Sequence, residues 1–173
     1  MDTKNLFMTP VTARLIRAEY GLGLVVATVL FFVHLDQVRW LPALVLFAYI
    51  DLIGYLPGAI QYRRREGRIG KGYYVAYNTM HSMVTQGLLA LGWIWLWGFE
   101  WALLALPIHL CGDRALFGNY LKPFGLRFEP VTHQAYGSFR SEFAAADAAG
   151  AAGAADAGAA DSDATSLGRL PWR

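Results

Sequence analysis

The sequence has a single cysteine, Cys111, and few charged residues. One cysteine excludes an intramolecular disulfide and leaves the redox compartment undetermined. Charged residues make up 16% of the 173 residues and hydrophobic residues 55%, whereas about a quarter of an ordinary soluble domain is charged. This composition predicts a membrane protein. The net charge of +2 is small and gives no reason to expect nucleic acid as a partner.

Several motifs of well-known enzymes are also absent. The sequence has no glycine-rich phosphate loop, no Ser-His-Asp order and no Cys-x-x-Cys pair. It has no internal repeat, which disfavours a transporter built from inverted repeats. Residues 144–161 contain only Ala, Gly and Asp, a composition that cannot bury a core. We therefore expect a transmembrane domain over residues 1–143 and a disordered tail over residues 144–173.

Four apolar stretches predict transmembrane helices, at about 20 residues per crossing. Thr9 and Pro10 mark the start of the first stretch, and Tyr and Trp gather at the ends, as at a membrane interface. A signal peptide is the alternative for the first stretch, but no small-x-small cleavage site follows Val33. The stretches cover approximately residues 10–33, 41–60, 73–97 and 101–121. The predicted fold is an all-α, integral membrane, up-and-down four-helix bundle.

Basic residues predict the orientation of this bundle. They precede the first stretch, fill the loop over residues 61–72 and follow the fourth stretch, whereas the two opposite loops contain only Arg39. By the positive-inside rule, both termini and the 61–72 loop are cytoplasmic, and the chain is a multi-pass protein of the cytoplasmic membrane. The segment over residues 122–143 mixes aromatic and basic side chains, so we expect it at the interface, closing the cytoplasmic mouth of the bundle.

Five acidic residues and histidines fall inside the predicted stretches, where an ionisable residue costs roughly 2.5 to 3.5 kcal/mol on insertion scales. Four of them share one layer, because a rise of about 1.5 Å per residue places them about 10 to 14 Å from the cytoplasmic side. His109 lies one turn deeper and shares a helix face with Asp113 through i,i+4 spacing. Such residues usually face the bundle interior and mark function. The candidate catalytic residues are Glu19, Asp51, His81, His109 and Asp113.

Two imidazoles and up to three carboxylates are a ligand set suited to iron, manganese or zinc. The expected metal ligands are His81, His109 and Asp113. The neighbouring polar residues that could contact a cofactor are Asn78, Tyr55 and Arg114. The alternative is structural, because each imidazole could pair with a carboxylate, and Asp113 with the adjacent Arg114, in the absence of any ligand.

The same positions resemble those of a family of small bacterial four-helix membrane proteins, known only as a domain of unknown function. The resemblance covers roughly residues 15–125, and its most specific part lies in the fourth helix. The positions that carry it are Glu19, Asp51 with Gly54-Tyr55, Tyr77-Asn78-x-x-His81, and His109-x-x-x-Asp113-Arg114. The chain departs from that pattern in a longer arginine-rich loop and in one additional residue before Lys122. The resemblance implies that the polar positions recur together, and it implies no activity.

The leading functional hypothesis is a membrane-embedded enzyme acting on a lipophilic small molecule. With a redox metal the reaction would be oxygenation or desaturation; without one, buried carboxyl groups could drive isomerisation, cyclisation or hydrolysis. One alternative is an accessory subunit that holds haem or another cofactor through His81 and His109. A second is a small proton-coupled transporter. Glycines in the stretches would allow close packing within the bundle or in a homo-oligomer.

Overall fold

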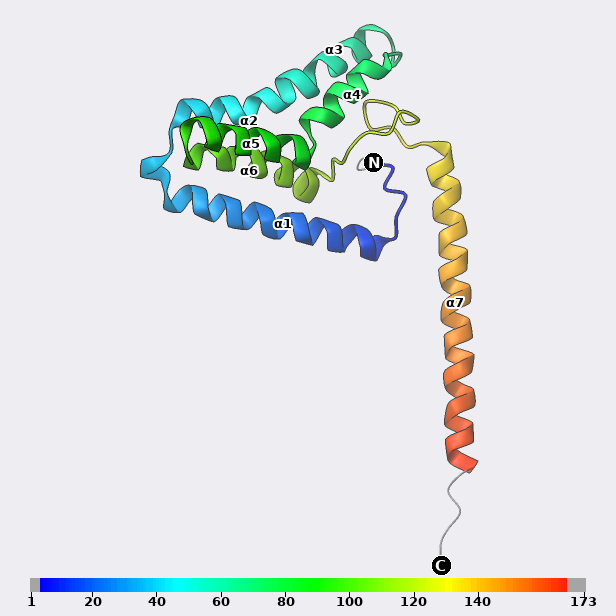
Figure 1. Ribbon diagram of the computed structural model, residues 1–173. Helices are drawn as coiled ribbons and strands as arrows, with labels where there is room; N and C mark the ends of the chain where they lie inside the picture. The colour runs from blue at the N-terminus through cyan, green and yellow to red at the C-terminus, as the bar shows by residue number, and fades with distance from the viewer. Residues whose placement is uncertain (1–3, 168–173) are drawn as a thin grey trace, which may run out of the picture. The chain divides into compact units, whose positions relative to one another are not determined.

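The computed structural model describes the backbone of residues 4–167 and the side chains of residues 4–154. Regular structure in this range is helical throughout and includes no strand, so the all-α class is confirmed. The chain forms two compact units, Met1–His133 and Gln134–Arg173. In the first unit, successive helices run back and forth (Figure 1).

Helix α1 (Pro10–Val33) begins where the sequence predicted. The Thr9 hydroxyl accepts a hydrogen bond from the backbone N–H of Thr12 at 3.0 Å, and Pro10 occupies the first turn, where its missing N–H has no helical partner to lose. Helix α1 packs against α6 (Ala105–Gly112) through small side chains. The small residues on this face include Ala13, Gly23 and Ala27.

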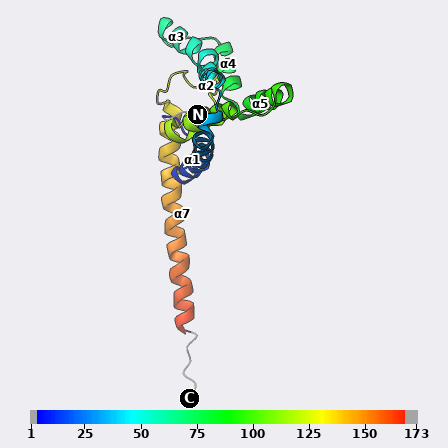
Figure 2. The same cartoon turned by 90° about the vertical axis from the view of Figure 1, so that its left-hand side faces the viewer.

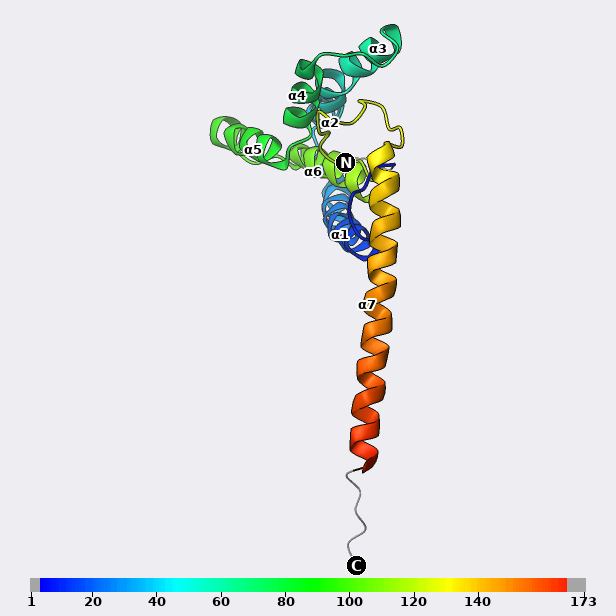
Figure 3. The same cartoon turned by 90° about the vertical axis from the view of Figure 1, so that its right-hand side faces the viewer.

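The second predicted stretch forms two helices, α2 (Trp40–Gly54) and α3 (Leu56–Arg64), that meet at Tyr55. Pro57 explains the interruption, because its ring and missing N–H disturb the preceding turn. The third stretch is also divided, into α4 (Lys71–Met80) and α5 (Met83–Trp97), with His81 and Ser82 between them. Helix α5 projects to one side of the other helices (Figures 2 and 3).

The fourth predicted stretch combines three kinds of helix. A 3-10 turn, η2 (Trp101–Leu104), leads into α6, and a π-helical turn, η3 (Asp113–Phe117), follows. The turn ends at Gly118, whose φ of 64° is in the left-handed region that favours glycine. Arg17 of α1 donates hydrogen bonds of 2.9 Å to the carbonyls of Ala115 and Leu116. These carbonyls lie in the last turn of the helix, where no later backbone N–H is available to bond them.

Within the described residues, two helical segments are long and apolar enough to cross a membrane: α1, and the α2–α3 pair over Trp40–Arg64. The sequence predicted four such segments. Helix α5 is apolar but shorter, because the third stretch is divided at His81. The fourth stretch is divided between η2, α6 and η3.

The first unit has two clusters of buried apolar residues. The larger one, which we call the aliphatic core, lies near the connection between α1 and α2. At its end, Arg39 pairs with Glu100 at 2.7 Å, and Trp101 donates to Gln37 at 3.1 Å. The aliphatic core comprises Val38, Ala43, Leu46, Ile50, Ala102, Leu103, Ala105, Leu106 and Leu110. The smaller cluster, the aromatic core, comprises Ala59, Tyr74, Tyr77 and Phe128.

The loop over residues 118–133 folds back onto α3 and α4. Phe128 is fully buried and lies against Gly58, where a Cβ atom would come within 2.3 Å of its ring. Asn78 of α4 bonds the backbone of Lys122 in both directions, at 2.8 and 2.6 Å. The buried Asn5 holds the backbone at Val131 with a 2.8 Å hydrogen bond. This loop therefore covers the end of the unit opposite the aliphatic core.

The second unit contains helix α7 (Gln134–Leu167). The composition predicted disorder from residue 144 onward, and the structure has a helix there instead. Alanine dominates this segment and is the strongest helix former, so local propensity favours a helix even where little apolar surface is available for packing. Residues 168–173 of the predicted tail lie outside the described residues.

The first unit exposes apolar side chains and buries polar ones. Leu22 of α1 is 67% exposed, Leu41 of α2 74% and Trp95 of α5 84%. The buried polar and charged residues are Asn5, His81, Gln86, His109, Arg114 and Lys122. This distribution is the reverse of the one expected for a soluble domain, in which charged groups are almost never fully buried and extended apolar surface is rare.

Candidate metal centre

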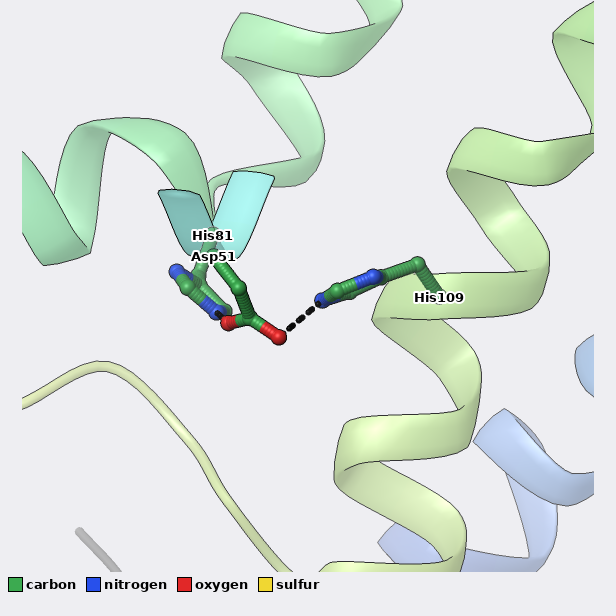
Figure 4. Close-up of side chains that lie close together, drawn as sticks. All are labelled: Asp51, His81 and His109. Carbon is green, nitrogen blue, oxygen red and sulfur yellow. Dashed lines mark hydrogen bonds and ion pairs between the residues drawn. The ribbon is translucent and has the colours of Figure 1, made fainter. Parts of the chain in front are cut away.

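Four side chains from three passes of the chain meet in one group, part of which is shown in Figure 4. His81 Nε2 lies 3.2 Å from Asp51 Oδ1 and 3.4 Å from Asp113 Oδ2. His109 Nε2 lies 3.7 Å from Asp51 Oδ2 and 3.6 Å from Asp113 Oδ2. We call these four residues the His/Asp cluster. Of the five ionisable residues predicted to converge, the structure brings these four together.

The cluster is buried on the imidazole side and open on the Asp51 side. The side chains of His81 and His109 are 6% and 4% exposed, and that of Asp113 is 18% exposed. The Asp51 side chain is 50% exposed. A ligand could therefore reach the cluster past Asp51 while both imidazoles stay shielded by protein.

The atoms facing one another in the cluster need a positive charge among them. His81 Nδ1 lies 3.0 Å from the Tyr77 carbonyl, so Nδ1 carries a hydrogen, and Nε2 lies 3.2 Å from Asp51 Oδ1. A neutral ring would direct the Nε2 lone pair at the carboxylates, whereas a protonated ring would donate to Asp51. His109 Nε2 is buried and has no hydrogen-bond partner within the described part of the chain. Lone pairs and carboxylate oxygens repel one another. A metal ion, or a proton on an imidazole, would remove the repulsion.

The spacing of the cluster suits a metal ion. Nitrogen and oxygen ligands bind zinc at about 2.0 to 2.2 Å, so two ligands of a tetrahedral site lie about 3.3 to 3.6 Å apart. The nitrogen–oxygen distances in the cluster range from 3.2 to 3.7 Å. His81, His109 and Asp51 offer ligand atoms that all lie within 4.8 Å of one another. This group could hold a metal ion, and Asp51 contributes to it as directly as the predicted ligands do.

The break between α4 and α5 positions His81. Because the helix is interrupted, the carbonyls of Met80 and His81 do not accept the hydrogen bond that a continuous helix would supply from the backbone N–H four residues later. The Gln86 amide donates to the Met80 carbonyl at 2.6 Å and accepts a hydrogen bond from the Tyr49 hydroxyl. Arg114 donates to the His81 carbonyl at 3.0 Å. Because Gln86 and Arg114 are both buried, these bonds satisfy the backbone where water is absent and fix the orientation of the break.

Close packing of α2 against α4 brings Asp51 to His81. Gly54 lies one turn after Asp51, and a Cβ atom there would come within 2.8 Å of the Met80 Cβ and 3.2 Å of His81 Nδ1. Any side chain at Gly54 would therefore push the two helices apart. The distance between Asp51 and His81 depends on this glycine.

Helix α6 and η3 supply the other two members. His109 and Asp113 are four residues apart, as predicted, and face the same side. Asp113 is the first residue of the π-helical turn. Turns of this kind occur frequently at functional sites. Arg114 donates to the Tyr20 hydroxyl at 2.8 Å as well as to the His81 carbonyl. Among the described residues the Asp113–Arg114 pair of the structural alternative is therefore not seen, whereas its imidazole–carboxylate pairs are.

The structure does not place Glu19 in the cluster, so its predicted catalytic role stays a prediction. It lies exposed on α1 and, within the described residues, makes no ion pair with the other four. Its depth along the helix is compatible with the site, but its face is not. Tyr20, Gly23 and Ala27 define the inward side of α1, and Glu19 is turned from Tyr20 by about 100°.

The remaining predicted contact residues surround the cluster without joining it. Tyr55 donates from its hydroxyl to Glu129 at 2.9 Å. Asn78 holds the backbone of Lys122, and Arg114 holds the helix break. These side chains position neighbouring parts of the chain, and Tyr55 also lines a cavity beside the cluster.

Two cavities adjoin the cluster from different sides, and Asp51 and Asp113 line both. A polar cavity of about 250 Å³ lies toward the 118–133 loop. Its other lining residues are Tyr55, Tyr77, His81, Asn119, Lys122, Glu129 and Pro130. An apolar cavity of about 330 Å³ lies toward α1. Its other lining residues are Leu24, Phe47, Ile108, His109, Gly112, Leu116 and Phe117.

Three residues near the cluster were not predicted as parts of the site. Gln86 holds the helix break, and its signal was available: an amide in an apolar stretch, five residues after His81. Lys122 is buried, with Nζ 4.6 Å from the Tyr77 ring centroid and 4.5 Å from that of Phe128. Lys122 and Glu129 reach the polar cavity only because the loop folds back, a long-range contact that no local pattern reveals.

Compared with known protein families, with curated proteins and with solved structures, the chain matches none. The resemblance to a family of small four-helix membrane proteins therefore rests on the motif residues alone. The function has to be argued from the geometry of the site.

Proposed function

We propose that this protein is a metal-dependent enzyme of the membrane that acts on a lipophilic small molecule at the His/Asp cluster. The observation that carries the proposal is the convergence of two buried imidazole nitrogens on two carboxylates at ligand-like spacing. Two histidines and one or two carboxylates suit iron, manganese or zinc and leave coordination positions for water, oxygen or substrate.

The membrane part of this proposal is supported by the reversed distribution of side chains. Helix α1 contains an 18-residue window that is apolar enough to cross a membrane, and only 6% of that window is buried. A core helix of a soluble protein would be mostly buried. Lipid can cover the exposed leucines and valines of α1, α2 and α5 without cost, whereas water cannot. We propose that four passes span the bilayer, with the interrupted third and fourth passes completing the polar interior.

The lipophilic substrate is supported by the surroundings of the cluster. The apolar cavity reaches His109 and Asp113 from the side of α1, and the polar cavity reaches the same Asp113 from the loop side. An amphiphile could place its apolar part in one cavity and its polar part in the other. The bond between the two parts would then lie at the metal.

A haem-holding subunit is less compatible with this geometry. Two histidines that bind haem face each other across the iron, with the flat ring between them. Here the carboxylates of Asp51 and Asp113 lie within 3.7 Å of both imidazoles. These carboxylates occupy the space that the ring would need.

Metal analysis of the full chain, purified from membranes in detergent, tests the proposal. The protein is incubated with Fe(II), Mn(II) or Zn(II), passed through a desalting column and measured by mass spectrometry of the metal. We expect about one ion per chain in the wild type and loss of at least about 90% of it in the His81→Ala, His109→Ala double variant, because both imidazole ligands are removed.

His34→Ala is the matched control. His34 lies at the other end of the unit, stacked on Trp101 at 3.5 Å between ring centroids, so this variant should keep the full metal content. A wild-type protein that retains no metal after all three incubations would refute the metal centre. In that case, a proton on one of the imidazoles would be the source of the positive charge in the His/Asp cluster.

A further inference from the structure

An apolar groove follows α1 and α2 away from the His/Asp cluster. It consists of the apolar cavity described above and a second cavity of about 220 Å³. Phe47 and Ile108 line both cavities, so the two are neighbouring parts of one groove. The other lining residues of the second cavity are Thr28, Phe31, Phe32, Trp40, Ala43, Leu44 and Ala105.

The groove has a polar end and an aromatic end. At the first, His109 and Asp113 line the wall of the groove itself. At the second, the ring of Phe31 lies 5.9 Å from that of Trp40 and 6.1 Å from that of Phe32, edge to face. The groove therefore begins at the proposed metal ligands and ends at three aromatic rings.

The length of the groove can be read from α2. Trp40 and Asp51 mark its two ends and are eleven residues apart, a helical rise of about 16 Å. An extended saturated hydrocarbon of about 12 carbons has this length. A chain whose polar end reaches the cluster would bring its last carbons against the ring of Trp40.

We propose that this groove binds the hydrocarbon chain of a single-chain amphiphile of about 12 carbons with a polar head, the substrate class of the proposed enzyme. The chain would enter sideways from the bilayer, with its head at the cluster and in the polar cavity. There, the head would meet the carboxylates of Asp51, Asp113 and Glu129 and the Lys122 side chain, whose Nζ donates to the Phe128 carbonyl. This inference rests on the proposed function for its catalytic meaning, but binding can be measured separately.

An ordinary bilayer lipid fits this groove less well. Bilayer lipids keep their heads at the membrane surface, with their chains pointing inward. The polar end of this groove is formed by Asp51, His109 and Asp113, which the predicted topology places about 10 Å or more from the cytoplasmic surface of the membrane. A molecule in this groove must therefore place its polar head below the membrane surface, and the heads of two-chain phospholipids stay at that surface.

Photochemical labelling of the full chain in phosphatidylcholine nanodiscs tests the proposal. The probe is dodecanoic acid with a diazirine at the end of its chain, and labelled peptides are identified by mass spectrometry. We expect labels on the peptides of Phe31, Phe32 and Trp40, and a reduction of at least about fivefold by excess unlabelled dodecanoic acid. Labelling that excess acid does not reduce, and that is equally strong on the exposed face of α5, would overturn the proposal.

Leu44→Trp and Leu41→Trp form a matched pair of variants. Both leucines are exposed on α2, at 61% and 74%, but only Leu44 lines the groove. Leu44→Trp should reduce the displaceable labelling at least about fivefold at unchanged metal content, and Leu41→Trp should leave both unchanged. Equal labelling of the two variants would contradict a groove site.

A second variant lengthens the groove and does not depend on filling it. Phe32→Ala removes one ring at the aromatic end, so hexadecanoic acid should displace the label better from this variant than from the wild type, by about fivefold. An unchanged preference for dodecanoic acid would refute the aromatic end as a limit. Displaceable labelling in a protein that binds no metal would refute the proposed function and support binding in the groove. Bound metal without displaceable labelling would refute binding in the groove and support the metal centre.

Discussion

The aliphatic core and the His/Asp cluster join neighbouring helices of the first unit in different ways. In the aliphatic core, Ile50, Ala102 and Leu106 are at most 2% exposed and bring α2, η2 and α6 together without a charged group. At the cluster, α2, α4 and α6 are joined through two imidazoles and two carboxylates. The first region shows that these helices pack well with apolar residues alone. The second region instead pairs ionisable groups, and it is there that we propose a metal ion binds.

Neutralising the two carboxylates of the His/Asp cluster should reduce the difference between the two regions most. The double variant Asp51→Asn, Asp113→Asn should lower metal affinity at least about 100-fold, because neutral amide oxygens are poorer ligands than carboxylates. The metal-free protein should melt at an unchanged or higher temperature, because repulsion in the cluster is relieved. Competition with a chelator and thermal unfolding measure the two effects.

Asp36→Asn is the control for this variant, since Asp36 lies exposed in the 3-10 turn η1 (Leu35–Gln37) at the opposite end. It should change neither quantity. A lower melting temperature of the metal-free double variant would mean that the cluster holds the helices together after all.

The next largest effect is expected at Gln86. Gln86→Leu removes the donor to the Met80 carbonyl, so the α4–α5 break can reorient and carry His81 with it. Substituting a residue that holds a metal ligand in place typically lowers metal affinity 10- to 100-fold, and we expect a loss of about 30-fold here. Gln37→Leu removes a side-chain hydrogen bond at the end of the aliphatic core and should leave metal affinity unchanged. Equal effects of the two variants would contradict the positioning role.

Gly54→Ala should act less strongly. The added methyl group meets Met80 and His81, and overpacking typically costs about 1 to 3 kcal/mol. We expect metal affinity to fall about 10-fold and unfolding to occur at lower denaturant. Gly87→Ala is the control, because a Cβ atom at Gly87 meets nothing within 4 Å. If both variants bind metal like the wild type, close approach of α2 and α4 is not required.

The smallest effect on the metal is expected from the aliphatic core itself. Leu106 is 2% exposed, and Leu106→Ala should cost about 2 kcal/mol of stability through the cavity that it leaves. Metal affinity should stay within about twofold of the wild type. A larger loss would show that the two regions are coupled.

Depth along the helices was predictable from the sequence, whereas the direction of each side chain was only partly so. The i,i+4 spacing of His109 and Asp113 fixed their common face, and both belong to the cluster. Glu19 is exposed, whereas its neighbours Arg17 and Tyr20 contact the fourth stretch. The spacing of these three polar residues did not show which of them faces inward.

The interruptions of the helices were not predictable from apolar length. Tyr55 and Pro57 show the first interruption in hindsight, because proline disfavours the preceding turn. The break at His81 and Ser82 has no such residue and depends on Gln86, in the second turn of α5, and on Arg114, which reaches it from η3. Helix α7 differs from the predicted disorder because composition describes what a segment can bury and not which backbone conformation alanine prefers.

The π-helical turn η3 makes the fourth predicted stretch tolerant of a change in chain length. A π turn holds one more residue than the corresponding α turn, so loss of a residue after Arg114 would restore an ordinary helix. His109 and Asp113 would keep their places, whereas Leu116 and Phe117, which line the apolar cavity, would rotate by about 100°. In the course of descent, a single insertion or deletion here could exchange the side chains that face a substrate without moving a metal ligand.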